Sequence, residues 1–239
     1  MITEKSTVNL KERKFNMEKY KQEFITFLAA SGALQFGEFT LKSGRLSPYF
    51  VNTGLFSTGE QLATLGKYYA EAIKNSYQDN FDFLYGPAYK GISLAVATAA
   101  SLSKDFGLNK GYTFNRKEVK DYADKKLLIG HQPKEGERVI IIDDVITDGG
   151  ALIESMELLQ NVANLKYTGV ILSVNRQEKT KEGKNAVDNF EKTYNMPINF
   201  IVTISEIMEY LDNREINGQV LLNDNKLQQI KNYLKQYGV

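Results

Sequence analysis

Residues 139–151 read Val-Ile-Ile-Ile-Asp-Asp-Val-Ile-Thr-Asp-Gly-Gly-Ala, and this segment constrains the fold more than any other. Its aliphatic run is too short for a helix and matches a strand that is buried on both faces. Apolar residues then follow at helical spacing, at Leu152, Ile153, Met156, Leu159 and Val162. The segment is therefore predicted to join a strand of a parallel sheet to a helix. It would lie at the carboxyl end of that strand, where open α/β sheets bind ligands.

The loop within this segment has the chemistry of a ribose phosphate site. Gly149 and Gly150 allow backbone N–H groups to approach an anion, and the start of the following helix adds partial positive charge. Asp143 and Asp144 would repel a phosphate, but they can accept hydrogen bonds from hydroxyl groups or hold a divalent cation through its waters. A solvated Asp-Asp pair before an ordinary turn is the alternative, and the flanking strand and Thr-Asp-Gly-Gly turn disfavour it.

Two further loops place cations after predicted strands. Residues 86–91, Gly-Pro-Ala-Tyr-Lys-Gly, precede a helix, so Lys90 can meet an anion near the helix start. Residues 115–121, Asn-Arg-Lys-Glu-Val-Lys-Asp, hold three cations that suit a pyrophosphate leaving group. An ordinary loop and a solvated charged face are the alternatives for these two segments taken alone. Residues 117–130 are expected to form a long loop or short hairpin, and long loops in compact domains are often lids.

The composition limits the class of protein and its partners. The chain has 239 residues, of which 42% are hydrophobic, so we expect one α/β domain with a smaller appendage. A net charge of +1 gives no reason to expect a nucleic-acid or membrane partner. The absence of cysteine excludes disulfides, zinc thiolates and a cysteine nucleophile. Residues 1–16 are polar and lack the apolar core of a signal peptide, so we expect a poorly ordered extension on a cytoplasmic protein.

Predicted strands alternate with predicted helices, which indicates a mostly parallel central sheet flanked by helices and joined by right-handed crossovers. Short strands with tight turns are expected over residues 36–56. A short apolar strand is expected at residues 81–85, and further strands are expected at residues 111–115, 167–174 and 198–203. Helices are expected at residues 18–30, 61–75, 92–103, 185–194, 205–211 and 225–237.

From Tyr20 to Val239 the chain resembles the orotate phosphoribosyltransferase family of the type I phosphoribosyltransferases. Residues 36–45, 47–50, 86–91, 114–121, 139–151 and 173–178 carry the resemblance. It implies the type I phosphoribosyltransferase fold as a single domain over residues 17–239, with a small N-terminal hood near residues 17–56. It also implies Mg²⁺-dependent transfer of ribose 5-phosphate from phosphoribosyl diphosphate (PRPP) to orotate, in de novo pyrimidine (UMP) biosynthesis. The Mg²⁺ would be held mainly by PRPP and water, and the enzyme would be a homodimer with shared sites.

The resemblance assigns roles to individual residues. PRPP would be bound by Lys42, Tyr89, Lys90, Arg116, Lys117, Lys120, Tyr122, Asp143, Asp144, Val145, Ile146, Thr147, Asp148, Gly149, Gly150 and Ala151. Orotate would be contacted by Phe50, Val51, Thr147 and Arg176. The catalytic groups would be Lys120, Arg116 and Asp144. No residue is assigned to direct coordination of a metal.

The chain departs from the family pattern at two positions. Tyr122 stands where many members have a histidine, and it can donate a hydrogen bond but is uncharged near neutral pH. Val51 stands where an aromatic residue is common, so one stacking face would be thinner. The single histidine, His131, is expected at the surface of a loop and outside catalysis.

Three other functions fit parts of the sequence less well. A phosphoribosyltransferase for a purine or uracil is disfavoured by Arg176 and Lys42, because a carboxylated base calls for a cation. A non-catalytic PRPP-sensing regulator would not need the cations of residues 116–120. A nicotinamide-dependent dehydrogenase would carry Gly-x-Gly-x-x-Gly after a strand, and this chain does not.

Overall fold

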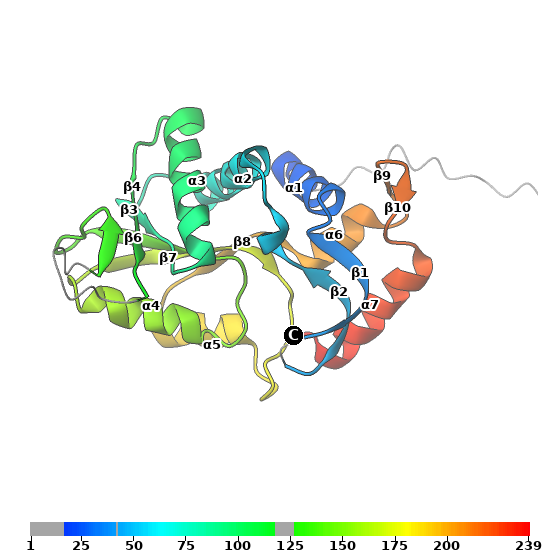
Figure 1. Ribbon diagram of the computed structural model, residues 1–239. Coiled ribbons are helices and arrows are strands. Elements are labelled where there is room, and N and C mark those ends of the chain that lie inside the picture. Colours follow the sequence, from blue (N-terminus) through cyan, green and yellow to red (C-terminus); the bar gives the residue numbers. More distant parts are fainter. Residues whose placement is uncertain (1–16, 42, 118–126) are drawn as a thin grey trace, which may run out of the picture.

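The computed structural model describes residues 17–41, 43–117 and 127–239, and a six-stranded sheet lies at its centre (Figure 1). The order of the strands is β5-β4-β3-β6-β7-β8. Their bounds are β3 (Phe83–Tyr85), β4 (Gly111–Asn115), β5 (Leu128–Gly130), β6 (Arg138–Ile142), β7 (Lys166–Asn175) and β8 (Ile198–Thr203). β5 runs antiparallel to β4, and the other neighbouring pairs are parallel. The predicted mostly parallel sheet is confirmed.

The central strands are buried on both faces. On β6, Ile140 and Ile142 belong to one apolar cluster, whereas Val139 and Ile141 belong to another, and all four are fully buried. Because successive side chains on a strand point to opposite faces, an uninterrupted aliphatic run supplies both layers at once. The aliphatic run of β6 therefore forms a strand that is covered by helices on both sides.

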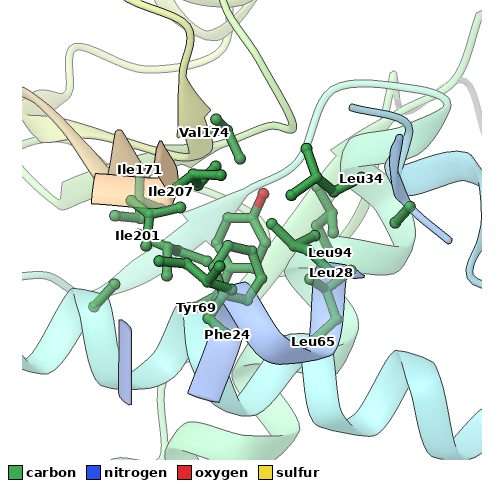
Figure 2. Packing of buried hydrophobic residues seen from close by; sticks show 14 of the residues in the cluster. Phe24, Leu28, Leu34, Leu65, Tyr69, Leu94, Ile171, Val174, Ile201 and Ile207 are labelled. Carbon is green, nitrogen blue, oxygen red and sulfur yellow. The ribbon is translucent and has the colours of Figure 1, made fainter. Parts of the chain in front are cut away.

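Helices cover the two faces of the sheet (Figure 1). One apolar cluster includes residues of α1 (Lys19–Ala30), α2 (Gly59–Tyr77), α3 (Lys90–Phe106), α6 (Ile204–Leu211) and α7 (Asp224–Tyr237). The other includes residues of α4 (Gly150–Gln160) and α5 (Ala186–Tyr194). Figure 2 shows the first cluster, with Phe24 and Tyr69 facing Ile171 of β7.

The helices differ from the expected bounds mainly at their ends. α2 begins earlier than expected because Thr58 and Gln61 form a reciprocal capping box. α3 extends to Phe106 and ends at Gly107, whose φ is +67°. α4 ends at Gln160, so the expectation that Val162 lies on its apolar side is wrong, and Val162 is 42% exposed.

Two small hairpins lie outside the central sheet. β1 (Leu34–Thr40) pairs antiparallel with β2 (Leu46–Val51), and the short 3-10 helix η2 (Thr53–Leu55) follows. These elements confirm the short strands expected over residues 36–56. The sequence reading missed the second hairpin, β9 (Glu215–Ile216) with β10 (Gln219–Val220).

The strand order identifies the part of the sheet where a ligand site is expected. The chain runs outward from β3 to β4 and β5, then returns to β6 on the other side of β3. In open α/β sheets, ligands bind at the carboxyl ends of the strands where the order reverses in this way. The loops that follow β3 and β6 therefore lie at the same end of the sheet, on either side of the reversal.

Candidate active site

An ion pair joins the loops that follow β3 and β6. The Lys90 ammonium donates to Asp144 Oδ2 at 2.6 Å, and the Thr53 hydroxyl of η2 donates to the same oxygen at 3.1 Å. Asp144 Oδ1 accepts from the backbone N–H of Val145 at 2.9 Å. The Asp144 side chain is only 12% exposed, whereas that of Lys90 is 53% exposed. Asp144 is thus fixed in place, while Lys90 remains accessible to an anion.

The two adjacent carboxylates have different environments. Burial and the neighbouring charge of Asp144 raise the pKa of Asp143 to about 6. Asp143 Oδ1 accepts from the backbone N–H of Asp144 at 2.9 Å. The backbone between them is also held, because the Tyr69 hydroxyl donates to the Asp143 carbonyl at 2.8 Å and Ser173 Oγ donates to the Asp144 carbonyl at 2.5 Å. This rigid pair presents carboxylate oxygens that can accept hydrogen bonds from the hydroxyl groups of a ligand.

The turn before α4 has the backbone that the glycine pair predicted. Gly149 has a φ of +88° and caps the helix, a conformation that favours glycine. Asp148 Oδ1 accepts from the backbone N–H of Gly150 at 3.0 Å, and this bond lowers the pKa of Asp148. The first turn of α4 contains no acidic residue. Apart from the Gly150 N–H that Asp148 occupies, the partial positive charge of this turn can therefore face an anion beside the exposed Thr147.

The loops that follow β3 and β4 also meet. Asn115 Oδ1 accepts from the Tyr85 hydroxyl at 3.1 Å and from the backbone N–H of Ala88 at 2.9 Å. The Lys117 ammonium lies 5.5 Å from the centre of the Tyr89 ring. These contacts bring Lys117 beside the loop that carries Lys90, so predicted diphosphate ligands from two strands share one end of the sheet.

The predicted orotate residues lie in two different environments, a polar one around Arg176 and an apolar one around Phe50 and Val51. Arg176 follows β7, where its guanidinium lies 4.4 Å from the centre of the Tyr49 ring and its Nη2 lies 2.7 Å from Glu178 Oε1. Phe50 stacks on Phe39 at 5.5 Å, and Val51 packs against the larger apolar cluster. Because side chains alternate along β2, Phe50 and Tyr49 project from opposite faces.

Some of the predicted site residues contact one another in the structure, and some contacts involve residues that were not predicted. The predicted PRPP ligands Lys90 and Asp144 are in direct contact. Lys42, Lys120 and Tyr122 lie outside the described residues. Sequence reasoning missed Thr53, whose partner Asp144 is 91 residues away, and it gave no role to Glu178. These assignments to PRPP and orotate remain predictions.

The described residues hold neither a cluster of metal ligands nor a helix that could span a membrane. No group of three or more His, Cys, Asp or Glu side chains there is arranged to hold a metal ion. None of the helices there has both the length and the apolar character needed to cross a bilayer.

Comparisons with known proteins agree with this arrangement. The phosphoribosyl transferase domain family matches residues 56–207. An orotate phosphoribosyltransferase of Clostridium botulinum is 46% identical over 222 residues, covering 93% of this chain and 99% of the relative. One from Clostridium acetobutylicum is 46% identical over 223 residues, covering 93% of this chain and all of the relative. The crystal structure of an orotate phosphoribosyltransferase from Francisella tularensis is 39% identical, with a TM-score of 0.78, and the match covers 91% of this chain and 100% of that one. The chain therefore belongs to the orotate phosphoribosyltransferase family of enzymes.

Proposed function

We propose that this protein transfers ribose 5-phosphate from PRPP to N1 of orotate, giving orotidine 5′-monophosphate and pyrophosphate with inversion at the anomeric carbon. The observation that carries the proposal is the Lys90–Asp144 ion pair across the reversal of strand order. It puts a cation for a diphosphate beside a carboxylate for ribose hydroxyls. The orotate phosphoribosyltransferases that this chain resembles over nearly their full length support the choice of substrates.

Binding and catalysis would be divided among the loops. The N-terminus of α4 would hold the 5-phosphate, and Asp143 and Asp144 would accept hydrogen bonds from the ribose hydroxyls. Lys90, Arg116 and Lys117 would neutralise the departing diphosphate as an oxocarbenium-like transition state develops. Catalysis would then consist of positioning and charge stabilisation, and no covalent nucleophile is needed.

Orotate adds a flat ring with a carboxylate. Arg176 is suited to that carboxylate because a guanidinium offers several donors in one plane. Thr147 lies on the loop between the two proposed substrates, and Phe50 and Val51 would contact the ring. A purine or uracil would offer no carboxylate to the Arg176 N–H groups that Glu178 leaves free.

The carboxylates of the site fit a magnesium ion held mainly by substrate. Asp143 and Asp144 offer hard oxygen atoms, which suit Mg²⁺ and its waters. Asp144 Oδ2 already accepts from Lys90 and Thr53, which favours contact through water over direct coordination. The ion would neutralise part of the diphosphate charge.

We further propose a cytoplasmic homodimer with shared active sites, as the family resemblance implies. Lys120 would then stabilise the leaving group in the site of the neighbouring subunit. Sedimentation analysis and activity of mixed dimers that carry Lys120→Ala in one subunit would test this.

The decisive assay follows the absorbance of orotate with PRPP and Mg²⁺, with uracil and hypoxanthine as alternative acceptors. We expect orotate to be consumed and the other two bases to be left unchanged. No consumption of orotate under these conditions would overturn the proposed function.

A further inference from the structure

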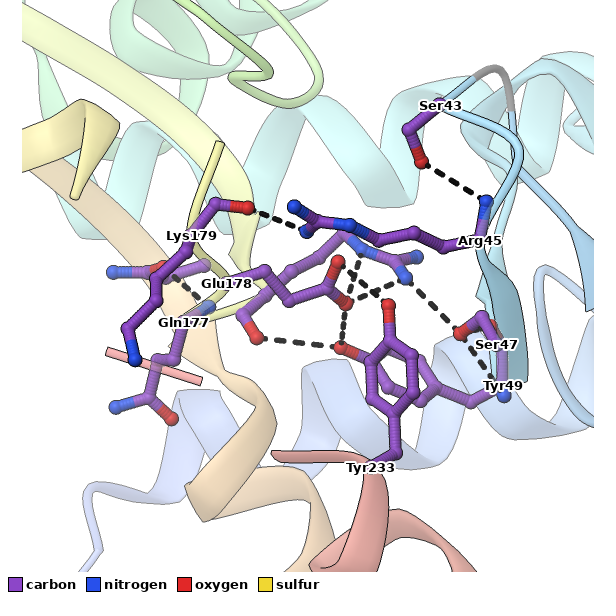
Figure 3. A network of polar contacts seen from close by, with 10 residues as sticks. Ser43, Arg45, Ser47, Tyr49, Gln177, Glu178, Lys179 and Tyr233 are labelled. Carbon is purple, nitrogen blue, oxygen red and sulfur yellow. Dashed lines mark hydrogen bonds and ion pairs between the residues drawn. The ribbon is translucent and has the colours of Figure 1, made fainter. Parts of the chain in front are cut away.

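The loop after β7 holds Glu178 in a polar cluster with Tyr49 and Tyr233 (Figure 3), and Arg176 donates hydrogen bonds to Glu178. We propose that Glu178 is a positioning residue for the acceptor, which fixes the Arg176 guanidinium in the orientation that receives a carboxylate. We also propose that the hydroxyl groups of Tyr49 and Tyr233 fix Glu178 in turn. The inference rests on the proposed function, in which Arg176 binds the carboxylate of the acceptor.

Glu178 accepts hydrogen bonds at both of its oxygens. Oε1 accepts from Arg176 Nε at 3.0 Å, from Arg176 Nη2 at 2.7 Å and from the Tyr49 hydroxyl at 2.6 Å. Oε2 accepts from the Tyr233 hydroxyl at 3.0 Å. The side chains of Arg176 and Glu178 are only 15% and 11% exposed. Donors on both sides therefore determine the position of this carboxylate.

The remaining contacts of Arg176 leave one edge of its guanidinium for a ligand. Nη2 also donates to Ser47 Oγ at 3.2 Å, and the guanidinium lies over the Tyr49 ring. Among the described residues, no carboxylate or carbonyl oxygen accepts a hydrogen bond from Nη1, although the Tyr233 hydroxyl also interacts with this guanidinium. The two N–H groups of Nη1 can thus bind an acceptor carboxylate while Glu178 holds Nε and Nη2.

Stability alone gives a weak reason for this pair. Burying two charges costs desolvation energy that their attraction only partly repays, so a buried ion pair is often no more stabilising than apolar residues. A fixed guanidinium, in contrast, loses little side-chain entropy when it binds a carboxylate. Positioning of the Arg176 guanidinium therefore explains the buried Arg176–Glu178 ion pair better than stability does.

The tyrosine hydroxyls remain donors under ordinary conditions. Burial raises the pKa of Tyr49 well above its usual value, and burial together with Glu178 raises the pKa of Tyr233 to about 12. Both phenols are therefore protonated near neutral pH and can donate to Glu178.

The C-terminal helix connects this cluster to the rest of the fold. Tyr233 lies on α7, and its ring meets the Tyr49 ring edge-on at 6.1 Å. The backbone N–H of Lys179 donates to the Tyr237 carbonyl at 2.8 Å, and that of Val239 donates to the Gln177 carbonyl at 3.0 Å. The last helix of the chain thus braces the loop that carries Glu178, although no PRPP motif lies on it.

The test compares Glu178→Gln and Tyr233→Phe with the wild type in steady-state assays that vary orotate and PRPP separately. We expect Glu178→Gln to raise the KM for orotate about tenfold, since a loss near 1.4 kcal/mol is a factor of ten. Tyr233→Phe, which removes one hydroxyl and keeps the ring, should raise it about threefold. The KM for PRPP and kcat should change less than twofold in both variants. Asp82→Asn, which removes an arginine-paired carboxylate at the other end of the sheet, is the matched control and should leave both KM values unchanged.

The outcomes separate this inference from the proposed function. An active wild type whose KM for orotate is unchanged in both variants overturns the inference alone. An equal rise in the KM values for orotate and PRPP also overturns it, because that result indicates general damage. If Glu178→Gln does not fold, Tyr233→Phe decides between the same outcomes. A wild type that does not consume orotate overturns both proposals.

Discussion

The two ends of the central sheet treat their carboxylates differently. At the amino ends of β3 and β6, Asp82 forms an ion pair with Arg138, whereas at the carboxyl end of β6, Asp143 lies next to the carboxylate of Asp144. Arg138 donates to Asp82 from Nη2 at 2.7 Å, from Nε at 3.1 Å and from its backbone N–H at 2.8 Å. These bonds lower the pKa of Asp82 to about 2. Burial and Asp144 raise the pKa of Asp143 to about 6. The carboxylate at the amino end is thus paired with a cation, whereas Asp143 at the carboxyl end has another carboxylate as its neighbour.

Other groups at the amino end are also paired. His131 Nε2 lies 2.8 Å from Glu137 Oε2, and its ring lies 4.9 Å from the ring of Phe83. His131 lies in a loop, as expected from the sequence, but its side chain is only 27% exposed because its ring packs against Phe83. The ring packs where β4 and β3 begin, and this contact is too distant in sequence to be seen as a pattern. The comparison indicates that the charged groups at the amino end stabilise the fold, whereas those at the carboxyl end form the proposed ligand site.

The strongest test of the comparison is Asp144→Asn. The variant removes the negative charge that pairs with Lys90. It also replaces the carboxylate that would accept hydrogen bonds from the ribose hydroxyls by a neutral amide. We expect kcat/KM for PRPP to fall roughly 100-fold or more, the scale of losing one preorganised electrostatic contact. Steady-state kinetics with Asp82→Asn as control would measure this. Activity within a few-fold of wild type would remove Asp144 from the site.

Asp143→Asn should separate stability from activity. A carboxyl group whose pKa is raised on folding contributes stability below its unfolded pKa, and that contribution is lost as the pH rises through the folded pKa near 6. Above pH 6 the wild type therefore carries a cost that the amide lacks. We expect the variant to be about 1–2 kcal/mol more stable than wild type at pH 8 and to use PRPP less well.

Urea unfolding of Asp143→Asn and wild type at pH 4 and pH 8 would measure this difference. The gain should be confined to the higher pH. A variant that is less stable than wild type at pH 8 would contradict the conclusion that ionised Asp143 destabilises the folded protein.

The carboxyl end of the sheet was the more predictable of the two, for a physical reason. The proposed binding groups of its loops are backbone N–H groups and side chains that are adjacent in sequence, so Gly149 and the Asp143–Asp144 pair lie within one short segment. The α/β class followed likewise from local alternation and aliphatic runs.

Contacts between distant segments could not be predicted in this way. Thr53 reaches Asp144 across 91 residues, and Tyr233 reaches Glu178 across 55. Only the folded chain brings such pairs together. The β9–β10 hairpin was different, because Asn217-Gly218 is a strong turn signal, with φ values of +51° and +79°, and it could have been found.

Asp82→Asn tests the other side of the comparison. A carboxyl group whose pKa is lowered on folding contributes stability above its unfolded pKa, and that contribution is lost as the pH falls from about 4 towards 2. Because the pair is partly exposed, we expect a loss of only about 1 kcal/mol at pH 7. Urea unfolding should show this difference shrinking below pH 4, with kcat/KM unchanged at pH 7. A constant difference down to pH 2 would argue against the ion pair as its cause.

The finest test exchanges one glycine for alanine at each end of the sheet. Gly149 has a φ of +88° and Gly136, in the turn before β6, has a φ of +79°. A Cβ would lie 3.4 Å from Phe190 at Gly149 and would meet nothing within 4 Å at Gly136. Backbone strain should therefore dominate in both variants, at about 1 kcal/mol each.

Only Gly149→Ala should also raise the KM for PRPP, by roughly threefold to tenfold, because it alone alters the backbone that would face the 5-phosphate. Paired thermal unfolding and PRPP titrations would measure the two effects. Equal changes in KM for both variants would mean that strain anywhere around β6 disturbs the site, and the functional distinction between the two ends of the sheet would then fail.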